Sequence, residues 1–359
     1  MEKISLLNQV KLHFQGETPE LRKDLSAVHL SSDGHLWLGC DEGANLERLT
    51  LINPDTKDNF GEHKRFQIQD YLDLPANDET EVDIEGLAES DHYLWLVGSH
   101  SWKRKSPKSD RSDAYNIKRL ATIEAEANRY LLARIPLIEG ELYQSHPSPS
   151  PSDSNKILSA AKLEATRDGN LLTEALADDP HLGAFVKSEI PSKDNGFDIE
   201  GLAVSHDRIF LGLRGPVLRG WAVILELQVE NSGNGLLKLK KIGDNGRRYK
   251  KLFVNLQGLG IREVSIEGED LIILGGPTMS LDGPVKIFRL ENGMHLGDNT
   301  LSKPKAVIDI PFGEGYDHAE GITQFTDLSG KPSILVVYDS PDPKRLLGTH
   351  DILADVFEV

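Results

Sequence analysis

The chain has 359 residues, of which 38% are hydrophobic and 27% charged, a composition typical of a globular protein with a large core. Its formal net charge of −17 argues against nucleic acid or an anionic membrane as a partner, and its single cysteine, Cys40, excludes a disulfide framework or a multi-cysteine metal site. We identify neither an apolar run long enough to span a membrane nor a signal peptide, and we therefore expect a cytoplasmic protein.

Residues 9–14 alternate polar and apolar side chains and predict a strand. This strand precedes the first copy of a six-residue pattern that recurs five times along the chain, most clearly as DIEGLA at 83–88 and 198–203. The third positions of the aligned copies are Ser26, Glu85, Glu200, Glu263 and Glu320. They are 59, 115, 63 and 57 residues apart, which fits a repeating unit of about 60 residues with one interval nearly twice as long.

After each copy come a turn and a short apolar run. The runs are HLWLGC at 35–40, YLWLVGS at 93–99, RIFLGLR at 208–214, DLIILGGP at 270–277 and SILVVYDS at 333–340. Turn residues between apolar runs indicate hairpins, and two further strand-like runs complete each unit. Four antiparallel strands in a repeated unit are the pattern of a β-propeller blade.

The unit that starts at Glu320 contains only three strands before the chain ends at Val359. The strand at residues 9–14 supplies the missing fourth strand, which closes the ring and removes its exposed edges. We therefore predict an all-β protein, a five-bladed propeller formed by one domain over residues 1–359. Six blades are the alternative, if the long interval contains a degenerate blade.

The long interval, residues 103–195, is interpreted as a loop-and-helix insertion within blade two. Residues 103–119 are basic and polar and predict a loop, whereas residues 156–182 contain leucines near helical spacing and predict helix. The insertion begins on the face of the ring where strand two ends, so it is placed to cover that face as a lid.

Several longer segments resemble the DUF3616 family, whose function is unknown. They include LWLVGSHSWKR, KDNGFDIEGLA, FLGLRGPVLRGWA, GPTMSLDGP and YDSPDPKRL, and the resemblance covers roughly residues 20–350. The repeat of an acidic residue followed by Gly-Leu-Ala is also similar to propeller proteins with esterase-like phytase activity. The second resemblance implies a hydrolase and identifies no catalytic residue.

Propeller geometry brings the start of strand one and the end of strand two to the same face of each blade. We therefore expect Glu85, Glu200, Glu263 and Glu320 to surround one axis as metal ligands. Carboxylates that converge repel one another unless a cation, a proton or an arginine compensates them, and an oxygen-only ligand set suits Ca²⁺ or Mg²⁺ better than zinc. A nucleotide or flavin cofactor is not indicated, because no phosphate-binding or dinucleotide motif is present.

The loops that follow strand two supply the other candidate residues. The ligand-binding candidates for a small anionic molecule are Lys103, Arg104, Arg214, Arg219 and Asp339. Arginine binds phosphate and carboxylate groups through two hydrogen bonds at once. His100 and His318 are the candidates for proton transfer.

Two functions follow from these residues. The first is divalent-cation-dependent hydrolysis of an ester, lactone or phosphoester at the mouth of the channel. The alternative is a non-catalytic binding or assembly module, in which the glutamates accept backbone N–H groups of the neighbouring blade and the arginines only neutralise them. The substrate, the metal and the oligomeric state are left open by the sequence.

Overall fold

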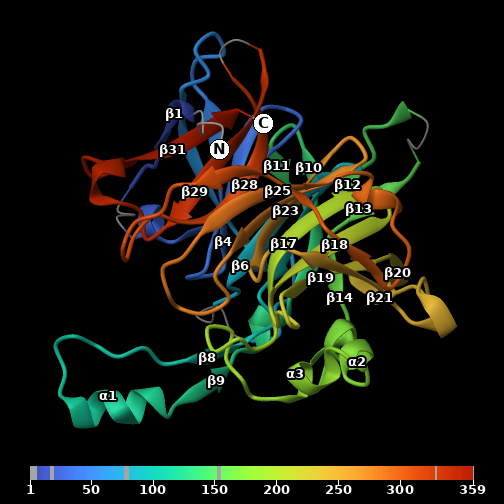
Figure 1. The fold of residues 1–359 in the computed structure, drawn as a ribbon. Coiled ribbons are helices and arrows are strands. Elements are labelled where there is room, and N and C mark those ends of the chain that lie inside the picture. Colours follow the sequence, from blue (N-terminus) through green and yellow to red (C-terminus); the bar gives the residue numbers. More distant parts are fainter. Residues whose placement is uncertain (1–5, 17–19, 77–80, 152–154, 328–329, 359) are drawn as a thin grey trace.

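The five copies of the six-residue pattern lie on or at the start of five strands, each followed by its apolar run as antiparallel partner (Figure 1). The computed structural model describes residues 6–16, 20–76, 81–151, 155–327 and 330–358. The strands that carry the copies are β2 (Leu25–Leu30), β6 (Ile84–Ser90), β17 (Asp198–Ser205), β23 (Gly260–Glu267) and β28 (His318–Thr326). Their partners are β3 (His35–Cys40), β7 (Tyr93–Gly98), β18 (Arg208–Gly215), β24 (Asp270–Gly276) and β29 (Pro332–Asp339). The all-β class and these hairpins are confirmed.

Further strands extend each hairpin away from the strand that carries the copy. In the first three groups they are β4 (Asn45–Leu51) and β5 (Asn59–Gln67); β10 (Leu132–Ile138), β14 (Ala161–Leu163), β21 (Leu236–Leu239) and β20 (Val229–Gly233); and β19 (Trp221–Leu227), β22 (Lys250–Asn255) and β26 (Thr300–Ser302). In the last two groups they are β25 (Val285–Leu290) and β27 (Lys305–Ile310), and β31 (Asp351–Glu358) and β1 (Leu6–His13).

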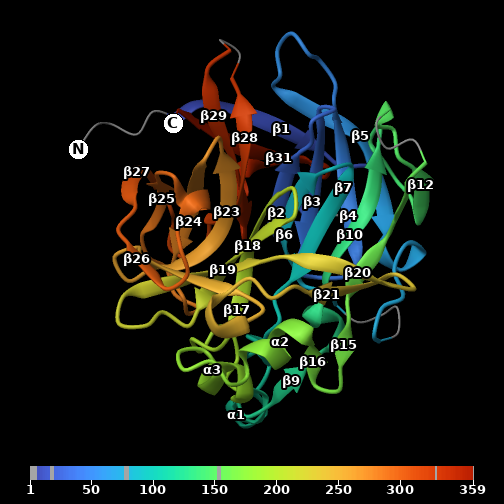
Figure 2. The same cartoon turned by 90° about the vertical axis from the view of Figure 1, so that its right-hand side faces the viewer.

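The strands that carry the copies contact one another in a closed order. β2 contacts β6, β6 contacts β17, β17 contacts β23, β23 contacts β28, and β28 contacts β2. The predicted N-terminal strand is confirmed: β1 pairs antiparallel with β31, and the two lie side by side in both views (Figures 1 and 2). Because β1 also pairs in parallel with β5, the first and last groups join into one nine-stranded sheet, so the hydrogen-bonded sheets do not correspond one to one to the five groups.

The core lies between neighbouring groups of strands, where apolar side chains of one group face those of the next. Trp37 of β3 and Phe66 of β5, for example, share a cluster with Ile84 of β6 and Leu94 of β7. The strands approach closely enough that a side chain at Gly86 would place its Cβ 2.6 Å from the Cβ of Leu202. The glycine after the glutamate therefore permits close packing of neighbouring strands.

Residues 103–195 differ in part from the predicted loop and helix. Within 103–119 the structure has β8 (Trp102–Arg104) and the start of α1 (Asp113–Leu120), whose first turn is capped by Ser112. Within 156–182 only α2 (Leu171–Leu176) is helical, and α3 (Gly183–Lys187) follows. The predicted helix over residues 156–170 is wrong because β14 pairs there with β10, and strand pairing overrides local helix propensity.

The remaining short strands of this segment are β9 (Ile123–Ala125), β11 (Glu141–Leu142), β12 (Ser145–Pro147), β13 (Ile157–Ser159), β15 (Ala165–Thr166) and β16 (Gly169–Asn170). The three α-helices lie together on one side of the molecule, at the bottom of both views (Figures 1 and 2). Within the described ranges, no helix combines the length and the apolar character that crossing a membrane requires.

Candidate functional site

The glutamate of the repeated pattern is the extra residue of a β-bulge. In the β6–β7 pair, Ile84 lies opposite Gly98 and Gly86 lies opposite Val97, so Glu85 has no partner across the ladder. The register shifts in the same way at Ser26, Glu200 and Glu320. A bulge re-aims a side chain, and bulges are frequent beside functional sites. The repeated sequence therefore gives each of these side chains the same place on its strand.

The fourth strand of the ring corrects the sequence alignment. In the β23–β24 pair the register shifts between Ile261 and Glu263, so the bulged residue is Arg262. The buried carboxylate of Glu263 instead accepts hydrogen bonds from the backbone N–H groups of Leu202, at 2.9 Å, and Val264, at 2.8 Å. The prediction that Glu263 joins the other glutamates as a metal ligand is thus wrong, because this copy of the pattern is displaced by one residue.

Arg262 bridges two of the predicted glutamates. Its Nη1 lies 2.9 Å from Oε2 of Glu200 and 2.6 Å from Oε1 of Glu320. Glu200 also accepts a hydrogen bond of 2.5 Å from Nη1 of Arg214. Burial raises the pKa of the Glu200 carboxyl, but Arg214 and Arg262 outweigh burial and hold that pKa below its usual range. Glu200 is therefore a compensated carboxylate.

Glu85 and Asp198 lack such compensation. Neither oxygen of Asp198 has a hydrogen-bond partner although the residue is only 1% exposed, and the nearest cationic group is Nη1 of Arg214 at 3.6 Å. No described residue donates a hydrogen bond to the buried carboxylate of Glu85. Burial, and next the charge of Glu200, raises the pKa of both carboxyls well above the usual range.

Two adjoining cavities open where these strands begin. The first, which we call the acidic cavity, has a volume of about 390 Å³, and Glu85, Asp198 and Glu200 are among the described residues that line it. Its lining contains nine carboxylates and six basic side chains. The second, which we call the His318 cavity, has a volume of about 370 Å³. The residues that line both cavities are Lys193, Arg214, Ser280, Glu320 and Asp339.

His318 lies between two carboxylates at the second cavity. Its Nε2 is 3.1 Å from Oδ1 of Asp282 and its Nδ1 is 3.9 Å from Oδ2 of Asp339. The neighbouring carboxylate of Asp339 raises the pKa of His318 above its usual value. Burial raises the pKa of the neighbouring Glu320 to about 7, despite the opposing charge of Arg262. Glu320 can therefore gain or lose a proton close to neutral pH, and an imidazole lines the same cavity.

The other predicted residues divide into two groups. Lys103 and Arg104 line the acidic cavity, where they pair with Glu81 at 2.5 Å and Asp194 at 2.7 Å. Arg219 is exposed and lines neither cavity.

His100 also lies away from the two cavities. It is buried beside α2, where its Nδ1 bonds to the carbonyl oxygen of Gly98 and its Nε2 to the side chain of Asn170, each at 2.8 Å. Burial lowers the pKa of His100 to about 4, so its imidazole is neutral and both ring nitrogens are already occupied.

Sequence reasoning missed Lys193, Arg129 and Arg262 as site residues. Lys193 belongs to a segment that bridges Trp102 at Pro191 and Met279 at Asp194, and it lines both cavities. The sequence does carry a signal for Lys193, because it is the first residue of the KDNGFDIEGLA motif that also contains Asp198 and Glu200. Arg129, which pairs with Asp83 at 2.9 Å, carries no such signal, because it comes from a 3₁₀ turn 46 residues away in the chain.

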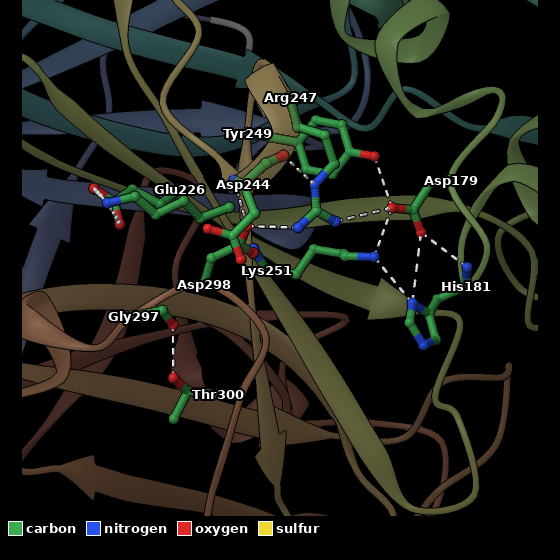
Figure 3. A network of polar contacts seen from close by, with 11 residues as sticks. Asp179, His181, Glu226, Asp244, Arg247, Tyr249, Lys251, Gly297, Asp298 and Thr300 are labelled. Carbon is green, nitrogen blue, oxygen red and sulfur yellow. Dashed lines mark hydrogen bonds and ion pairs between the residues drawn. The ribbon is translucent and has the colours of Figure 1, made fainter.

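The segment that delivers Lys193 is anchored to the β-sheets by a buried network (Figure 3). Oδ2 of Asp179 lies 2.5 Å from Nζ of Lys251 and 2.7 Å from the hydroxyl of Tyr249. The side chains of Asp179 and Lys251 are both fully buried. Breaking a buried pair leaves an uncompensated charge, so this network fixes the segment that contains α2 and α3 against β22.

Within the described ranges, no three His, Cys, Asp or Glu side chains are placed so that together they could hold a metal ion. The predicted cage of four glutamates is therefore not formed in this structure. The arrangement instead offers two uncompensated carboxylates beside basic groups that can bind an anion.

Comparison of the sequence with known protein families assigns the chain to one family. The family described as protein of unknown function (DUF3616) matches residues 24–355. No curated protein matches the chain.

Several solved structures are similar to this chain at low identity. Virginiamycin B lyase from Staphylococcus aureus is 12% identical, with a TM-score of 0.37 over 98% of this chain and 99% of that one. The PQQ-bound aldose sugar dehydrogenase from Streptomyces coelicolor is 12% identical, with a TM-score of 0.36 over 99% and 98%. A putative gluconolactonase is 11% identical, with a TM-score of 0.40 over 93% and 75%. Likenesses of this size identify no shared activity.

Proposed function

Because the chain belongs to the DUF3616 family, whose function is unknown, we propose a function from the site alone: the mouth of the ring binds a small anionic molecule together with a divalent cation. We propose that the ring is a single-domain, five-bladed propeller with residues 103–195 inserted in blade two. The closed order of contacts among β2, β6, β17, β23 and β28 supports five blades. The placement of α1, α2 and α3 between β7 and β17 supports the insertion.

One observation carries the proposal: Asp198 is 1% exposed, lines the acidic cavity and has no hydrogen bond to either carboxylate oxygen. A buried carboxylate without a partner is costly, and functional sites are where proteins retain such groups. Glu85 lines the same cavity and is 8% exposed, and no described residue donates a hydrogen bond to it. The free energy lost by burying these two groups is recovered when a cation binds between them.

The cations that suit the carboxylates of Glu85 and Asp198 are Ca²⁺ and Mg²⁺, because both take oxygen ligands. Two carboxylates do not complete a coordination sphere, and Mg²⁺ is commonly held by one or two carboxylates with the remaining positions taken by water and by oxygens of an anionic ligand. Arg214 and Lys193 line the same cavity and can bind that anion. Without a cation, the excess of carboxylates in the cavity repels an anion, so we expect the two to bind together.

The chemistry that fits is hydrolysis of an ester, lactone or phosphoester. The cation, when bound, would polarise the oxygen of the group that is attacked. Glu320, with a pKa of about 7, and His318, held by Asp282 and Asp339, are the residues of this chain that can accept or deliver the proton. Arg262 positions Glu320 through its 2.6 Å contact.

A non-catalytic binding or assembly module is the second candidate, and a specific observation favours it. Glu263 bonds to the backbone of the neighbouring strand β17, and Arg262 ties β17 to β28 through Glu200 and Glu320. These contacts hold the ring together whether or not a ligand binds. They account for Glu200, Glu320 and Oε1 of Glu263 but leave Glu85 and Asp198 unexplained.

Titration calorimetry with Ca²⁺ and with Mg²⁺ tests the proposal. We expect one bound cation in the unmodified protein and at least tenfold weaker binding in Asp198→Asn and Glu85→Gln. The matched control is Glu226→Gln, which removes an equally buried carboxylate that pairs with Arg208 and lines neither cavity. Absence of cation binding, or equal binding by all three variants, would leave the non-catalytic module as the better account.

A further inference from the structure

Three large apolar side chains that are exposed to solvent line one cavity. Met279 is 45% exposed, Leu281 is 53% exposed and Phe312 is 45% exposed, and all three line the His318 cavity. Exposed apolar side chains are ordinary when scattered singly, whereas several around one concave site mark a surface that an apolar group covers. We call these three residues the apolar wall.

The apolar wall is built on two segments that are tied together. Met279 and Leu281 lie between β24 and β25, and Phe312 lies between β27 and β28. The backbone N–H of Gly315 donates a 3.0 Å hydrogen bond to Asp282, which joins the second segment to the first. The bridge between Asp194 and Met279 ties the first segment to the one that carries Lys193. The wall is therefore preorganised, which lowers the entropy lost when a ligand is bound.

Charged side chains line the same cavity. Arg262, His318 and Glu320 line it, and Lys193 and Arg214 continue from it into the acidic cavity. A ligand that occupies both cavities thus meets cationic groups and the proposed cation at one end and apolar side chains at the other. A purely polar ligand would leave the apolar wall in contact with water.

We propose that the ligand is amphiphilic: a carboxylate or phosphate head that reaches the acidic cavity, joined to an alkyl or aryl group that lies against Met279, Leu281 and Phe312. The inference rests on the proposed function for the head group and adds the chemical class of the rest of the molecule. The volume of about 370 Å³ in the His318 cavity is within the range of small-molecule sites.

A series of straight-chain carboxylates from acetate to octanoate, titrated calorimetrically in saturating Mg²⁺, tests this inference. We expect affinity to rise by about two- to fourfold for each added methylene until the chain extends past the wall, since one buried methylene contributes up to about 0.8 kcal/mol, a fourfold change. In Met279→Ser and Phe312→Ser the increase per methylene should be smaller. Leu301→Ser is the matched control, because Leu301 is 66% exposed on β26 and lines neither cavity.

The outcomes separate the inference from the function on which it rests. Chain-length dependence that is lost in the wall variants and kept in the control supports the inference. If that dependence persists in Asp198→Asn and without Mg²⁺, the apolar wall stands and the cation site does not. Binding that is independent of chain length overturns the inference while leaving the cation site in place. Failure of every carboxylate to bind overturns the inference, and the metal titration then decides the function separately.

Discussion

The segments 83–88 and 198–203 have the same six residues and the same bulge, yet their glutamates are in opposite electrostatic states. Burial and neighbouring carboxylates raise the pKa of Glu85 well above its usual range, whereas two arginines hold the pKa of Glu200 below it despite burial. Identical local sequence therefore fixes the backbone and the aim of the side chain but not its charge.

The difference comes from two neighbours. Near Glu200, the residue after the partner of Ile199 on the paired strand is Arg214. Near Glu85, the residue after the partner of Ile84 on the paired strand is Ser99, which carries no charge. The neighbouring strand β23 places the cationic Arg262 beside Glu200. The neighbouring strand of β6 is β17, whose Glu200 adds a second negative charge near Glu85. Glu200 is thus compensated and Glu85 is not, although the local sequence of the two segments is identical.

The largest expected effect on stability comes from removing Arg262, the arginine that compensates the charges of Glu200 and Glu320. Arg262→Met should lower the free energy of unfolding by about 3–5 kcal/mol at pH 8, because Glu200 and Glu320 would remain buried with one cationic partner fewer. Urea unfolding measures this change. Arg289→Met is the control, since Arg289 pairs with Glu267 and Asp270 at the surface, and we expect it to cost less than about 1 kcal/mol. Equal costs for the two variants would contradict the bridging role of Arg262.

The same substitution in the two identical segments should have opposite effects. Glu85→Gln removes an uncompensated buried charge and should raise the free energy of unfolding at pH 8 by about 1–2 kcal/mol, whereas Glu200→Gln should lower it by about 2 kcal/mol. Unfolding of both variants in the same buffer, free of divalent cations, gives the comparison. If the free energy of unfolding changes with the same sign in both variants, the environments of Glu85 and Glu200 do not differ as described.

A slope of stability against pH is expected as well. The pKa of Glu320 is raised from 4.5 to about 7 in the folded protein, so the folded state binds this proton more tightly than the unfolded chain. The stability that it contributes is present below about pH 4.5 and is lost as the pH rises to about 7, an effect of up to about 3 kcal/mol. Unfolding measured from pH 5 to 8 should show a smaller decline in Glu320→Gln than in the unmodified protein. An unchanged slope would place Glu320 among ordinary carboxyls and remove it as a proton carrier.

The sequence determined the repeating unit, the hairpins and the pairing of the N-terminal strand with the C-terminal one, as Val10, Leu12 and Phe14 illustrate. These features depend on the alternation of polar and apolar residues and on turn residues between the strands. Both patterns involve residues within a few positions of each other, so they can be recognised in the sequence without knowledge of the fold. The same local signals placed Glu85, Glu200 and Glu320 at equivalent positions. They failed at Arg262, because an alignment of residue types cannot register a displacement of one position in a ladder.

Tertiary structure alone decided which charged groups meet. Glu85 and Glu200 are 115 residues apart in the chain. Arg129 reaches the acidic cavity from the 3₁₀ turn before β10, and Lys193 reaches both cavities from the segment that follows the Asp179–Lys251 pair. It also decided that residues 157–163 form strands and that His100 is enclosed away from the site. The physical reason is that the state of a buried charge is set by distances to other charges and by exclusion of water, and both arise only when distant parts of the chain pack together.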